Sequence, residues 1–73
     1  MITVELEITY LPQYCVMTSV EKLEPEELAD LKHLISEAVS GKLSFMKFVG
    51  KDGNIFYLGH NILINSKIEL IIK

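Results

Sequence analysis

The stretch from Ile2 to Tyr10 alternates strictly between apolar and polar positions. Every second side chain is apolar (Ile2, Val4, Leu6, Ile8, Tyr10), and the positions between them hold Thr3, Glu5, Glu7 and Thr9. Successive side chains of a β-strand point to opposite faces, so this pattern predicts an antiparallel strand with one face buried and the other in water. Pro12 ends it, because proline cannot donate a ladder hydrogen bond.

A second strand is predicted over residues 14–21, and the short loop before it favours a hairpin. One side of this strand carries Tyr14, Val16, Thr18 and Val20, and the other carries Cys15, Met17 and Ser19. Both sides hold apolar atoms, which is typical of a strand covered on two faces.

From Glu24 the apolar period changes to that of a helix, which we expect over residues 25–40. The apolar stripe consists of Leu28, Leu31, Leu34, Ile35, Ala38 and Val39. Pro25 suits the first helical position, and Gly41 is a good terminator.

The remaining chain predicts three more strands, over 43–49, 55–60 and 67–72, with a turn at 50–54. Residues 62–66 fit either a short strand or a helical turn. The order is therefore ββαβββ, in a single α+β domain covering 1–73. We expect a mostly antiparallel curled sheet or partial barrel with one helix packed on it. Leu6, Leu31, Ile35 and Phe45 are expected to be nearly fully buried.

One helix is too narrow for this sheet, because five strands span roughly 24 Å and a helix covers about 10 Å. The remaining apolar surface favours burial against a second copy, with a C2 dimer as the default symmetry. In the last strand, Ile68, Leu70 and Ile72 share one face, and Ile71 is expected to be exposed on the other. No later segment can cover its edge, so we expect this strand to lie at a subunit interface to which Ile71 contributes.

Composition narrows the class of partner. The net charge is −3, and all seven basic residues are lysine. Arginine, the residue best suited to bidentate phosphate contacts, is absent, which argues against nucleic-acid binding. Such binding would have to use scattered lysines and aromatic platforms (Lys42, Lys47, Lys51, Lys67, Phe45, Phe48, Tyr57). No apolar run is long enough to span a membrane, and the first residues do not resemble a signal peptide.

The sequence contains few residues that could support catalysis or metal binding. Cys15 is the only cysteine, so the chain forms no internal disulfide, which favours a reducing cytoplasm. We expect Cys15 to be packed mid-strand as a small apolar residue, and His33 to be solvated on the helix surface. A four-ligand zinc site cannot be assembled, and no cofactor is expected. Glu5 and Glu7 resemble a paired-acid site only in spacing, since a solvated strand face has the same pattern.

We therefore expect a non-enzymatic protein-interaction module, such as a regulator, an inhibitor or a phage accessory factor. Tyr57 and His60 are candidate interaction residues together with Ile71, because His60 stands at a strand end between Gly59 and Asn61. The simpler interpretation is that His60 is a turn residue whose side chain is hydrogen-bonded to local backbone groups. The alternative function is a small-molecule or nucleotide binder, with a pocket at the sheet end or between subunits. Its lining would be Tyr10, Tyr14, Tyr57 and His60.

Overall fold

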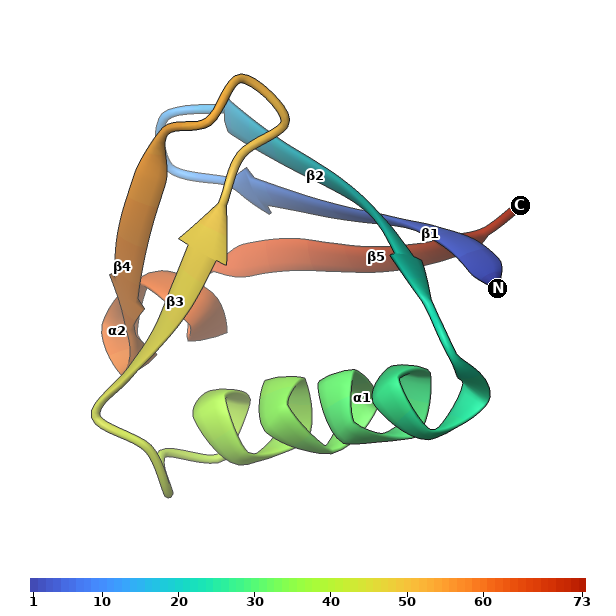
Figure 1. Cartoon of the computed structure of the whole chain (residues 1–73). Coiled ribbons are helices and arrows are strands. Elements are labelled where there is room, and N and C mark those ends of the chain that lie inside the picture. Colours follow the sequence, from blue (N-terminus) through green and yellow to red (C-terminus); the bar gives the residue numbers. More distant parts are fainter.

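The computed structural model describes all 73 residues, and Figure 1 shows the arrangement of its elements. They follow in the order β1 (Ile2–Tyr10), β2 (Cys15–Leu23), α1 (Pro25–Val39), β3 (Phe45–Val49), β4 (Ile55–Gly59), α2 (His60–Ile64) and β5 (Ser66–Ile72). The strands form an antiparallel three-stranded sheet, β2-β1-β5, and a separate antiparallel hairpin, β3-β4. The predicted α+β class, with one long helix packed on antiparallel sheet, is confirmed. β3 and β4 form ladder hydrogen bonds only with each other, so the five strands belong to two separate sheets.

β1 is the central strand of the larger sheet, and its predicted alternation is confirmed. Val4, Leu6 and Ile8 are buried on the inner face, at 2%, 6% and 0% exposure. The register pairs Leu6 with Ser19 of β2 on one side and with Leu70 of β5 on the other. Each strand therefore contributes alternate residues to the same inner face.

Helix α1 begins and ends where its sequence signals predict. The Glu24 backbone N–H donates to Oε1 of Glu27 at 2.9 Å, which caps the first turn. At the other end Gly41 adopts a φ of 86°, and the Lys42 N–H donates to the Glu37 carbonyl at 3.0 Å. This is a Schellman ending, in which a left-handed glycine satisfies carbonyls of the last turn.

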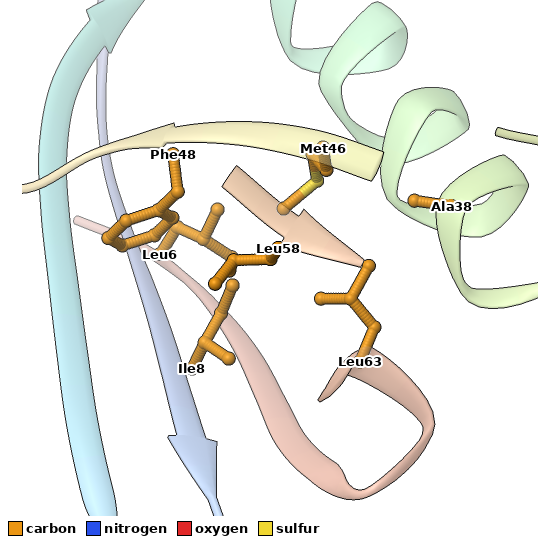
Figure 2. Packing of buried hydrophobic residues seen from close by; sticks show 7 residues of the cluster. All are labelled: Leu6, Ile8, Ala38, Met46, Phe48, Leu58 and Leu63. Atoms are coloured by element: carbon orange, nitrogen blue, oxygen red, sulfur yellow. The ribbon is translucent and has the colours of Figure 1, made fainter. Parts of the chain in front are cut away.

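The main core lies where the hairpin crosses the inner face of the larger sheet (Figure 2). Its buried residues come from five elements: Leu6, Ile8, Ala38, Met46, Phe48, Leu58 and Leu63. A smaller cluster of Val4, Leu23 and Leu28 lies under the first turns of α1. Of the four residues expected in the core, Leu6 is buried, Leu31 and Ile35 are half-buried, and Phe45 is exposed. Three of the four are therefore corrections. Met46 and Phe48 fill the core, so alternation turns Phe45 outward, and Leu31 and Ile35 line cavities beside α1.

Three other local expectations are corrected. Cys15 is exposed, because it is the first residue of β2 and lies at the strand end. The third strand begins at Phe45, and Leu43 is half-buried in the preceding turn. Ile71 is half-buried on the outer face, whereas Ile72, on the inner side of an edge strand, is 54% exposed. Residues 62–66, which fitted two structures, contain the end of the short helix α2 and the start of β5.

Neither helix combines the length and the apolar character that crossing a bilayer requires.

Candidate protein-interaction surface

The outer side of the β3-β4 hairpin is apolar and open to solvent. We call this surface the hairpin face and define it by Phe45, Val49, Ile55 and Tyr57. These side chains are 55%, 40%, 53% and 65% exposed, respectively. Scattered single apolar residues are normal on a protein surface, but four neighbours on one face of a two-stranded sheet form a patch. Such patches mark contact sites with other molecules.

The register of the hairpin brings these residues together. Val49 pairs with Ile55, Lys47 with Tyr57, and Phe45 with Gly59. Gly59 has no side chain, and the Phe45 ring instead contacts the Tyr57 ring edge-to-face, with centroids 5.5 Å apart and planes at 78°. This geometry suits the aromatic quadrupoles and holds both rings in place on the exposed face.

The turn at the tip of the hairpin is also well determined. Gly50 N–H donates to the Asn54 carbonyl at 2.8 Å, and the Asp52 carboxylate accepts from Nδ2 of Asn54 at 2.9 Å. Gly53 has a φ of 88°, a conformation that glycine adopts without strain. The Lys51 N–H donates to the Thr18 carbonyl of β2 at 2.9 Å, which ties the turn to the larger sheet. The hairpin face is therefore preorganised.

Tyr57, His60 and Ile71 lie in three different environments. Tyr57 belongs to the hairpin face. Ile71 lies on the outer face of the three-stranded sheet, where it pairs with Glu5 of β1. His60 begins α2 and is half-buried against the end of α1. Its Nδ1 lies 3.4 Å from the Ala38 carbonyl, and a Cβ added at Gly41 would meet Cε1 of its ring at 3.4 Å.

Phe45, Val49 and Ile55 were not expected to form an interaction surface. Phe45 was expected in the core instead. Lys47 lies on the same side of the strand as Phe45, and a lysine is almost never buried without a partner. That charge was the available signal for the outward face.

Cys15, His33 and His60 lie on three different elements, β2, α1 and α2. Nε2 of the exposed His33 lies 2.6 Å from Oε1 of the half-buried Glu37, one helical turn away. Cys15 is exposed at the start of β2. No group of three or more His, Cys, Asp or Glu side chains is positioned to hold a metal ion.

The cavities also differ from the pocket expected at the sheet end. None of the four is lined by Tyr10, Tyr14, Tyr57 or His60. The most enclosed, between β2, α1 and β3, holds about 50 Å³, well below the roughly 300–1,000 Å³ of small-molecule sites.

A wider groove runs between α1 and β5. It measures about 510 Å³, is open along one side, and has six apolar residues among the eight that line it. We call this feature the α1–β5 groove; its lining includes Ile35, Val39, Ile64, Ile68 and Leu70. It follows the edge of β5, which pairs with β1 alone. A free strand edge beside an apolar groove is a ready site for another chain.

No protein family, curated protein or solved structure matches this chain.

Proposed function

We propose that this chain is a small, non-enzymatic protein-interaction module that acts as a homo-oligomer and binds a protein partner through the hairpin face. The observation that carries the proposal is the exposed, preorganised patch of Phe45, Val49, Ile55 and Tyr57. Aromatic anchors of this kind dominate the energetics of protein interfaces. A regulator, an inhibitor or a phage accessory factor would work in this way.

The charge of the patch indicates the chemistry of the partner. Lys47 is the charged residue that lies across the ladder from Tyr57, and it is exposed. An apolar partner surface with an acidic group at its rim would complement this arrangement. The reducing cytoplasm is the location we propose, because Cys15 is a free and exposed thiol.

The small-molecule alternative has one observation in its favour. The α1–β5 groove has the volume of a ligand site, and a second copy could close its open side. Lys32 is its only charged lining residue, so it provides little for the phosphates of a nucleotide.

Capture from a lysate of the source cells tests the hairpin face. The bait proteins are the wild type, Tyr57→Lys and the control Val16→Lys, which changes a residue that is 57% exposed on β2. We expect a partner that is retained by the wild type and by Val16→Lys but is lost with Tyr57→Lys. If no captured protein distinguishes Tyr57→Lys from the control, the hairpin face is not the binding surface.

A further inference from the structure

We infer that the open edge of β5 pairs antiparallel with β5 of a second copy, about a two-fold axis through Ile68. The inference rests on the homo-oligomer of the proposed function and gives it a specific geometry. It would join two three-stranded sheets into one six-stranded sheet, with both α1 helices on the same face.

The backbone of β5 leaves alternate residues free to bond at this edge. The Lys73 N–H donates to the Thr3 carbonyl at 2.9 Å, and the Leu11 N–H donates to the Asn65 carbonyl at 3.1 Å. Bonded residues alternate along an antiparallel ladder, so the odd-numbered residues of β5 bond to β1. The N–H and C=O groups of Ile68 and Leu70 therefore point to the open edge. By contrast, the outer edge of β2 already accepts the bond from the hairpin turn.

The charged side chains of β5 favour one register of the β5–β5 pairing. Lys67 and Glu69 lie on the outer face, one residue before and one after Ile68, and their side chains are 63% and 43% exposed. With Ile68 on the axis, Lys67 lies directly across from Glu69 of the second copy, twice per dimer. An axis at Lys67 or at Glu69 would place like charges opposite each other, and an axis at Leu70 would place Lys67 opposite Lys73. Among the axes from Lys67 to Leu70, the Ile68 register alone pairs opposite charges, which stabilises a ladder. An axis at Ile71 would set Glu69 opposite Lys73, but Lys73 lies outside β5 and already forms an ion pair with Glu5 at 3.5 Å.

The monomer also carries an excess of negative charge at this place. Glu7 of β1 pairs directly with Glu69 of β5, and like charges in that position destabilise a sheet. Nζ of Lys67 lies 2.8 Å from Oε1 of Glu69, whereas no cation forms a salt bridge with Glu7. A second lysine from the other copy would balance the second carboxylate.

Two exposed apolar side chains are also placed symmetrically about Ile68. Ile64 and Ile72 lie four residues before and four after Ile68, and they are 53% and 54% exposed. In the Ile68 register, the end of one β5 runs past Ser66 of the second copy towards the end of its α2, where Ile64 lies. The two α1–β5 grooves meet on the inner face, so their apolar linings would form one continuous core.

A charge-swap experiment tests the register. Lys67→Glu alone and Glu69→Lys alone each place like charges across the ladder, and each should weaken the dimer about tenfold. An equimolar mixture of the two variants, one of them carrying an affinity tag, restores opposite charges across the interface. We expect mixed dimers in that mixture with a dissociation constant close to that of the wild type. Inside each variant chain the contact between positions 67 and 69 remains repulsive, so recovery reports the contact between copies.

Analytical ultracentrifugation of the wild type, Ile72→Lys and Val16→Lys completes the test. We expect a dimer for the wild type and for Val16→Lys, and a shift to monomer for Ile72→Lys. A dimeric wild type whose charge-swap mixture shows no recovery overturns the β5 register and leaves the homo-oligomer standing. A wild type that is monomeric at high concentration overturns both the β5 register and the homo-oligomer. The binding of a protein partner through Tyr57 is tested separately, by the capture experiment.

Discussion

The outer faces of the two sheets differ in polarity. Along the central strand of the three-stranded sheet, the outer face carries Thr3, Glu5, Glu7 and Thr9. The outer face of the β3-β4 hairpin carries Phe45, Val49, Ile55 and Tyr57. Both faces belong to antiparallel ladders with alternating side chains, and both have a well-packed inner side. Charged outer faces keep strands soluble and discourage unwanted pairing. The hairpin face carries one charge, Lys47, among four exposed apolar side chains, which is why we propose partner binding there.

The largest expected effect separates the two sides of the hairpin. Phe48 is 2% exposed and Phe45 is 55% exposed, although they lie on the same short strand. We expect Phe48→Ala to lower the free energy of unfolding by about 3–5 kcal/mol, as large core truncations do. Phe45→Ala should cost about 1 kcal/mol, since it removes surface contacts only. Urea denaturation measures both, and equal costs would mean that the hairpin face is part of a core.

A smaller effect tests whether the hairpin face is preorganised. The edge-to-face contact of Phe45 with Tyr57 should give a coupling free energy of about 0.5–1 kcal/mol. The measurement is a double-mutant cycle of Phe45→Ala, Tyr57→Ala and the double variant. Additive costs would contradict the prediction and describe two independent rings.

The charged face of the larger sheet is expected to respond in the opposite direction. Glu7→Thr removes a like-charge pair with Glu69 and should raise the free energy of unfolding, within the range of about 0.2–1 kcal/mol. Glu5→Thr is the matched control, because Glu5 lies 3.5 Å from Nζ of Lys73 and loses an ion pair instead. If Glu7→Thr is as destabilising as Glu5→Thr, the carboxylate at Glu7 is already compensated.

The smallest effect concerns the titration of Lys67. The hydrogen bond to Glu69, followed by the charges of Glu69 and Glu7, raises the pKa of Lys67 above its ordinary value of 10.5. A raised pKa stabilises the folded state below pH 10.5, and this contribution disappears as the pH rises through the folded-state pKa. Glu69→Gln should lower the pKa of Lys67 in an NMR titration of its side chain. An unchanged pKa would show that Glu69 does not hold the ammonium.

The extent to which the sequence predicted the structure differed between these regions. Strand β1 and helix α1 have strong and unambiguous periods, and their caps and breakers (Pro12, Pro25, Gly41) are local signals. Their boundaries were therefore predicted to within a residue or two. The hairpin was predicted as a pair of strands, but both of its faces carry aromatic residues, so the pattern did not identify the buried one.

The sequence predicted only part of the candidate surface. Tyr57 was expected to take part in an interaction, and its partners in the hairpin face emerged only when the register placed Phe45 opposite Gly59 and Val49 opposite Ile55. Tyr57 and His60, only three residues apart, were expected to share a site. The chain turns from strand into helix α2 between them, so Tyr57 faces solvent and His60 packs against the end of α1.

By itself, the sequence determined the α+β class, the alternation of each strand and the limits of α1, because these depend on neighbours along the chain. The single cysteine also excluded a disulfide within the chain. The tertiary structure decided that the strands form two sheets, that Phe48 is buried and Phe45 is not, and that β5 is an edge strand. Those outcomes depend on which distant segments compete for the same core volume, and in a chain with only 12 of 73 residues buried that volume is small. Apolar side chains exceed the space available in the core, and the excess forms the hairpin face and the α1–β5 groove.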